Sequence, residues 1–217
     1  MNEIIQMFSK IENEPDMFLA DKRLDYLFYY WMGVNVGEPA LRSYLFYSTL
    51  PEWIEKCLLA NGYKVNFSLV WYKMLYSAFE NEEDRWDFFF SHIYIHIRKC
   101  GKKQTEQEYW SKNSQIKNIN KWIHLIYGRP GIATGSSQKR IDYITHHFAG
   151  IYSKEDENLN SKEFEQITQY IYTFLVSKGY SIEKSKWWHK MINQITTDED
   201  EAWELLFEGL TKCFEQK

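Results

Sequence analysis

The chain has 217 residues, of which 44% are hydrophobic and 18% aromatic, with only 4 Pro and 10 Gly. This composition argues against a disordered chain and against a turn-rich β-sandwich, and it predicts a helical globular protein with a real core. The three cysteines show no C-x-x-C spacing, so we expect neither a disulfide framework nor a zinc knuckle, and a cytoplasmic location. The sequence has no signal peptide or long apolar run, so no membrane partner is expected.

Apolar residues spaced three and four positions apart predict a series of helices along the chain. IIQMFSKI opens a first unit, which continues with helices at 21–32, LPEWIEKCLLA, SLVWYKMLYSAF and DRWDFFFSHIYIHIRKC. Pro51 suits a first helical turn, and Gly62 lies just beyond the end of the same helix. A helix within 104–127 opens a second unit, with further helices expected at 138–149, 161–178, 183–195 and 199–214.

The phrase KRLDY at 22–26 returns as KRIDY at 139–143, and the similarity extends much further. With an offset of 117, residues 22–90 align to 139–207 without a gap, and 17 of the 69 pairs are identical. Two matched pairs are glycines that follow apolar runs, Gly33 with Gly150 and Gly62 with Gly179, where left-handed residues after helix ends are predicted.

The repeat predicts an all-α protein made of two tandem pseudo-symmetric helical-bundle repeats packed together. The first repeat covers 1–100, a basic helical connector that opens the second unit covers 101–121, and the second repeat covers 122–217. Trp71 aligns with Trp188 and Trp86 with Trp203, so the tryptophans are expected to be buried in equivalent places.

The net charge of −4 is unevenly distributed. Residues 1–97 carry 8 basic and 14 acidic side chains, 98–121 carry 7 and 2, and 122–217 carry 11 and 14. A nucleic-acid-binding domain usually presents a basic face over its whole length, which argues against nucleic acid as the partner. The alternative is an adaptor that docks on nucleic acid through the basic segment with Lys99, Lys102, Lys103, Lys112 and Lys117.

Two acidic runs, 80–84 and 198–201, each precede a strongly apolar helix. Carboxylates in this place satisfy free N–H groups and favour the positive end of the helix dipole, although an acidic binding face is the alternative. His92 and His96 have the four-residue spacing of paired metal ligands, but no H-E-x-x-H motif accompanies them. A metal-dependent helical enzyme that uses both histidines is therefore only an alternative, and no cofactor, metal site or catalytic residue is expected.

The first copy reads IENEPDMFLADKRLDYLFYYWMGVNVG, PEWIEKCLLANGYKVNFSLVWYKML and EEDRWDFFFSHI. It resembles a family of small all-helical bacterial proteins that open with a Pro-x-Met-[Tyr/Phe]-Leu-Gly-like phrase and continue with a Gly-Tyr helix end and an acidic-to-aromatic helix. The present chain departs from the phrase at Ala20 and at 132–135, which read Ile-Ala-Thr-Gly. Many proteins of this kind resemble immunity partners of polymorphic toxins, and the present chain looks like a tandem version.

The resemblance implies a non-catalytic module, not an enzyme, that binds and neutralises a cognate bacterial toxin in the cytoplasm. Tight inhibition of this kind relies on aromatic anchors and complementary charge. We expect the partner to contact polar and aromatic side chains of the first copy, namely Tyr29, Tyr30, Tyr44, Tyr47, Tyr72, Tyr76, Glu82, Glu83 and Asp84. About half of the tyrosines are expected to belong to the core instead.

Overall fold

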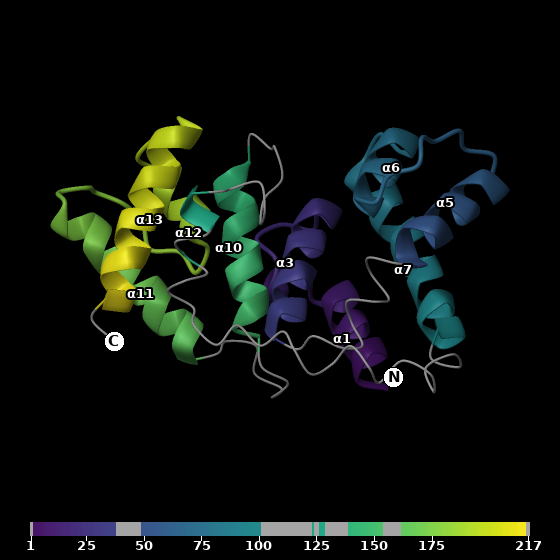
Figure 1. Ribbon diagram of the computed structural model, residues 1–217, viewed down its shortest axis with the longest axis horizontal. Helices are drawn as coiled ribbons and strands as arrows, with labels where there is room; N and C mark the ends of the chain where they lie inside the picture. The colour runs from purple at the N-terminus through teal and green to yellow at the C-terminus, as the bar shows by residue number, and fades with distance from the viewer. Residues whose placement is uncertain are drawn as a thin grey trace. The chain divides into compact units, whose positions relative to one another are not determined.

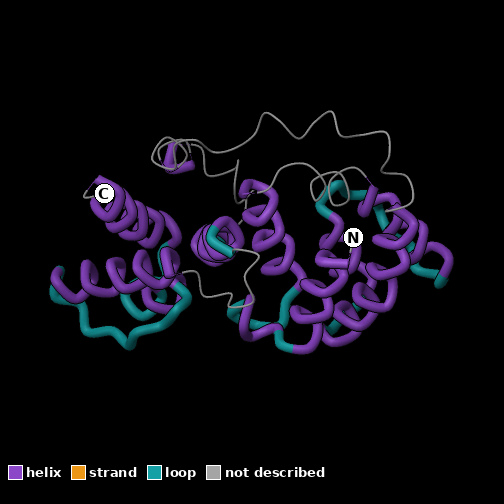
Figure 2. The backbone as a smooth tube through the Cα atoms, turned by 90° about the horizontal axis from the view of Figure 1, so that it is seen from below, coloured by secondary structure: helices purple, strands orange, loops and turns teal. Residues whose placement is uncertain are grey.

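The computed structural model describes residues 2–37, 49–100, 123, 126–128, 139–153 and 162–215. Every regular element in these ranges is a helix, and they contain no strand (Figure 2). The predicted all-α class is therefore confirmed. Within the same ranges, no helix combines the length and the apolar composition that a membrane crossing requires.

The chain divides into two compact units. Unit 1 comprises residues 1–28 and 38–115, and unit 2 comprises 29–37 and 116–217. Helix α3 (Leu24–Gly37) therefore begins in unit 1 and ends in unit 2. The expected connector 101–121 lies outside the described residues.

Unit 1 is organised around its longest helix, α7 (Glu82–Cys100), with α1 (Asn2–Asn13), α2 (Pro15–Phe18), α5 (Leu50–Ala60) and α6 (Trp71–Ala78) (Figure 1). Phe8 of α1 packs against Phe89 and Phe90 of α7, with ring centroids 6.2 Å apart in both pairs. Trp71 at the start of α6 is fully buried and stacks on Phe89 at 4.6 Å. Burial of these large rings supplies the main stabilisation of the unit.

Unit 2 contains α10 (Arg140–Ile151), α11 (Lys162–Ser177), α12 (Trp188–Ile192) and α13 (Glu199–Glu215). Helix α13 packs against the other three helices (Figure 1). Trp188 is fully buried, stacks on Phe164 at 5.2 Å and donates its indole N–H to the hydroxyl of Thr168 at 2.8 Å. Trp71 and Trp188 are thus equally buried.

Helices α5 and α11 end in the same way. Gly62 has a φ of 84° and Gly179 a φ of 92°, as the sequence predicted for a left-handed residue after a helix end. Behind these glycines, the N–H of Tyr63 donates to the carbonyl of Leu58 at 3.0 Å, and that of Tyr180 to Leu175 at 3.3 Å. Both helices therefore end with the same hydrogen bond from the N–H of residue i to the carbonyl of residue i−5.

The predicted left-handed role of Gly33 and Gly150 is wrong. Gly33 lies inside α3 and Gly150 inside α10, and both face a neighbouring helix. A Cβ on Gly33 would overlap the backbone carbonyl of His147, and a Cβ on Gly150 would overlap that of Tyr30. These glycines let two helix backbones approach more closely than any side chain allows.

The helix predicted at 183–195 is shorter than expected, because α12 begins only at Trp188. The hydroxyl of Ser185 accepts the N–H of Trp187 at 3.1 Å and holds the preceding chain in a local turn. In unit 1, Ser68 accepts the N–H of Val70 at 3.2 Å just before α6. In both units a serine hydroxyl therefore holds the chain in a turn, and the short helix begins at the tryptophan that follows.

Candidate functional site

The N-terminal end of α7 gathers several of the predicted partner-binding residues. Glu82, Glu83 and Asp84 form its first turn. Asn81 caps the helix, because its side-chain oxygen accepts the N–H of Asp84 at 2.8 Å, and its amide donates to the Asp84 carboxylate at 2.7 Å. At α7 the cap is therefore an amide and not a carboxylate, while the three carboxylates lie in the first turn, where the helix dipole favours negative charge.

The same arrangement recurs at the start of α13. Asp198 accepts the N–H of Glu201 at 2.8 Å and that of Asp200 at 3.0 Å. Asn81 and Asp198 are 117 positions apart and cap their helices in the same way.

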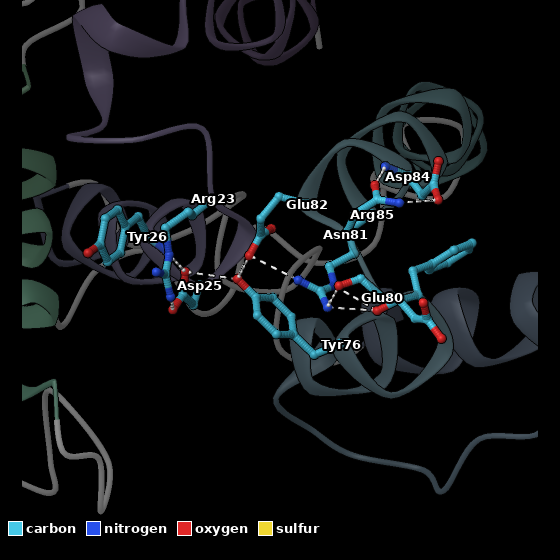
Figure 3. A network of polar contacts seen from close by, with 10 residues as sticks. Arg23, Asp25, Tyr26, Tyr76, Glu80, Asn81, Glu82, Asp84 and Arg85 are labelled. Atoms are coloured by element: carbon cyan, nitrogen blue, oxygen red, sulfur yellow. Dashed lines mark hydrogen bonds and ion pairs between the residues drawn. The ribbon is translucent and has the colours of Figure 1, made fainter.

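A polar network fixes the start of α7 to the start of α3 (Figure 3). Asp25 is 2% exposed and receives both Arg23 guanidinium bonds, at 3.0 and 2.6 Å, and the N–H of Tyr26 at 3.0 Å. The hydroxyl of Tyr76 reaches Asp25 at 3.2 Å and also contacts Glu82. Bidentate pairing of a buried carboxylate with arginine is among the stronger polar interactions in proteins.

The Tyr76 hydroxyl acts as a hydrogen-bond donor in this network. Burial raises its pKa well above the ordinary value, and the neighbouring carboxylates of Asp25 and Glu82 raise it further. The phenol therefore stays protonated at neutral pH, and its chemistry here is positioning of two carboxylates.

Arg85 closes the other side of the network. Its guanidinium lies over the Tyr76 ring at 4.1 Å, pairs with Glu82 at 3.1 Å and donates to the carbonyl of Phe79 at 2.7 Å. Because its side chain is only 12% exposed, this cation is held beneath the surface. Arg23, Asp25 and Arg85 were not among the predicted site residues; the recurrence of the KRLDY phrase was the only sequence signal for the first two.

Next to this network, three other carboxylates of α7 are exposed to solvent. The Glu83 side chain is 80% exposed and lies 3.8 Å from the ammonium of Lys22, and Asp84 and Asp87 are exposed as well. An exposed pair of this kind contributes little to stability. We call Glu82, Glu83 and Asp84 the acidic edge.

Three of the predicted tyrosines are not available at the surface. Tyr29 is 5%, Tyr30 2% and Tyr72 7% exposed. Tyr29 stacks on Tyr143 at 4.0 Å, and Tyr72 meets the ring of Phe28 at 5.2 Å. The expectation that these three side chains contact a partner is therefore corrected. They lie on the buried faces of α3 and α6. Tyr44 and Tyr47 lie outside the described residues.

Four partly exposed rings lie beside the acidic edge on unit 1. Tyr63 and Phe79 are 4.7 Å apart, Phe79 and Phe88 5.1 Å, and Phe88 and His92 4.2 Å, measured between ring centroids. All four side chains are partly exposed. We call Tyr63, Phe79, Phe88 and His92 the aromatic strip.

His92 and His96 are engaged separately. Nδ1 of His92 lies 2.7 Å from the carbonyl oxygen of Phe88, whereas Nε2 of the buried His96 lies 3.0 Å from the hydroxyl of Thr49. Trp53 stacks on His96 at 5.6 Å. Within the described residues, no group of three or more His, Cys, Asp or Glu side chains is arranged to hold a metal ion.

The basic segment considered for nucleic acid lies almost wholly outside the described residues. Of its five lysines only Lys99 is described, and its ammonium sits over the ring of Trp53 at 4.3 Å. Comparisons with models of protein families, with curated proteins and with solved structures found no match to this chain.

Proposed function

We propose that this protein is a non-catalytic binding module of the immunity type, which holds and neutralises a cognate bacterial toxin in the cytoplasm. The observation that supports it best is the acidic edge: the exposed carboxylates of Glu83 and Asp84 lie beside the partly buried Glu82, on a helix start that the polar network holds from beneath. Charges in fixed positions steer an oppositely charged protein and select it against others.

Local contacts hold two of the three carboxylates of the acidic edge. Glu82 is held by Tyr76 and Arg85, and Asp84 is held by the cap residue Asn81. A carboxylate held in place loses less conformational entropy when a partner docks. The acidic edge therefore suits recognition of a basic protein surface.

Co-expression tests the proposal directly. The product of the neighbouring open reading frame is expressed with and without this chain, and cell growth and complex formation are measured. Protection of the cells and a stable complex are expected. Failure of both removes the immunity function.

A charge reversal tests whether the acidic edge takes part in binding. We expect Glu83→Lys to slow association with the neighbouring gene product several-fold, with a loss of salt dependence, because exposed charges act mainly on the association rate. Glu165→Lys on the exposed face of α11 makes the same change in net charge and serves as the control. Equal association rates for the two variants would argue against this role of Glu83.

We also propose that the two sequence repeats descend from one duplicated helical bundle. In support, residues 117 positions apart make the same local bonds: the caps of Asn81 and Asp198, the turns of Ser68 and Ser185, and the helix ends at Gly62 and Gly179. An experimental structure in which α5 to α7 fail to superimpose on α11 to α13 would contradict a common origin.

A further inference from the structure

The aromatic strip of unit 1 has a counterpart in unit 2 that contains few rings. With the offset of 117, Phe79 corresponds to Thr196, Phe88 to Leu205 and His92 to Gly209; only Tyr63 keeps a ring, as Tyr180. One backbone hydrogen bond is common to the two units here. The N–H of Phe79 donates to Leu75 at 3.0 Å, and that of Thr196 donates to the corresponding Ile192 at 3.1 Å.

In unit 2 the corresponding face of α13 is buried, in part by α11. Leu205 is 8% exposed, and Gly209 is buried with the side chains of Phe174 and Ile171 of α11 directly above it. On α7 the equivalent Phe88 and His92 are only partly buried. One helical turn beyond His92 on the same face, Ile95 is 45% exposed. The rings of the strip are thus not needed to build this kind of helix pair.

Charge on the same face is mainly negative. Glu80, Asp84 and Asp87 are exposed beside the strip, and the exposed cation next to Tyr63 is Lys64. The guanidinium of Arg85 is directed inward, to the carbonyls of Phe79 and Glu80 and to Glu82. Rings at the centre and carboxylates at the margin are the pattern of an interface in which an apolar contact is surrounded by complementary charge.

We infer that the aromatic strip is the apolar centre of a docking surface for a basic protein, which inserts aliphatic or aromatic side chains against Phe79 and Phe88 while its lysines and arginines meet Glu80, Asp84 and Asp87. This inference rests on the proposed function and adds the surface that carries it. The neighbouring acidic edge steers the partner, and the strip supplies most of the affinity. The lack of rings in the unit 2 counterpart, apart from Tyr180, makes unit 1 the binding unit.

The second unit supplies the replacement residues for a test of the strip. In Phe79→Thr/Phe88→Leu, both rings are replaced by the residues that stand at the equivalent positions of unit 2. The full-length chain is titrated with the purified product of the neighbouring open reading frame, and affinity is measured by calorimetry. We expect the double variant to bind more than about tenfold more weakly, since loss of anchor rings at the centre of an interface has effects of this size.

Two controls separate the possible outcomes. Asp87→Lys is expected to weaken binding and Glu165→Lys to leave it unchanged, although both alter the net charge equally. If the wild-type chain binds the neighbouring product and the double variant, with an unchanged melting temperature, binds equally well, the strip is not the docking surface while the proposed function stands. If the wild-type chain does not bind at all, the proposed function falls and the inference falls with it.

Discussion

Gly33 and Gly150 make reciprocal contacts. Gly33 lies against the backbone of His147 and Ile151, and Gly150 lies against that of Tyr30 and Val34. Each contacted residue is 117 positions from its counterpart in the other contact, so the crossing of α3 and α10 has local two-fold pseudo-symmetry. At this crossing the two helix backbones touch directly.

This crossing predicts a strong penalty for any side chain. Gly33→Ala and Gly150→Ala should each lower the free energy of unfolding by about 2 kcal/mol or more, because the added methyl must separate two backbones. Urea denaturation measures the loss. Gly128→Ala is the control, since a Cβ there has open space around it and the residue has no left-handed φ. Equal stability of the crossing variants and the control would contradict the close approach.

The two left-handed glycines predict a smaller and equal effect. Gly62→Ala and Gly179→Ala should each destabilise the protein by about 1 kcal/mol, the cost of a left-handed conformation for an L residue, while a Cβ at either site meets nothing. Asparagine, which tolerates this region, should cost less than alanine. Chemical denaturation of the four variants compares their free energies of unfolding. A larger loss of stability for asparagine than for alanine would contradict this explanation.

Acid should destabilise the protein through His147. Burial lowers its pKa to about 4 in the folded chain, whereas the unfolded chain titrates near the ordinary value of 6.5. Between these values only the unfolded state takes up the proton, so the free energy of unfolding decreases by about 1.4 kcal/mol for each pH unit of acidification. Stability is fully present above pH 6.5.

The His147→Gln variant isolates this contribution. Urea titrations at several pH values between 7 and about 4 should show a shallower pH dependence for the variant than for the wild type. Carboxylates that titrate in the same range contribute equally to both chains and cancel in the difference. Parallel curves would exclude His147 as the source.

Removal of one hydroxyl tests the polar network. Tyr76→Phe leaves the ring under Arg85 but removes the hydroxyl that lies between Asp25 and Glu82, and it should cost about 1 to 3 kcal/mol, because hydrogen bonding to the buried carboxylate of Asp25 is lost. Tyr127→Phe, which removes a bond to Glu204 on an exposed side chain, should cost much less. Thermal unfolding compares the two variants, and a cost for Tyr76→Phe no greater than that of the control would show that the network contributes little.

Features with a local cause could be predicted from the sequence. The helices follow from apolar spacing, and the left-handed Gly62 and Gly179 follow from their place just after a helix. The N-terminal role of the acidic runs is also local, since it depends only on the free N–H groups of the next turn.

Features set by tertiary contacts could not be predicted in the same way. Gly33 also follows an apolar run, yet its role comes from a helix more than a hundred positions away. Tyr29 and Tyr76 both lie in aromatic stretches, but one is covered by Tyr143 and the other holds two carboxylates. The aromatic strip joins the end of α5, the end of α6 and the middle of α7, so no contiguous motif signals it.

The shared helix α3 sets a limit on how the chain can be cut. Residues 29–37 come from the first copy of the repeat but belong to unit 2. A fragment that starts after the basic segment would lack these residues. The surface of α10 around Gly150, which the backbone of Tyr30 and Val34 covers in the whole chain, would then be exposed to water. We expect such a half to recapture the missing helix from a separately supplied first half, so that the severed protein reassembles as a non-covalent heterodimer.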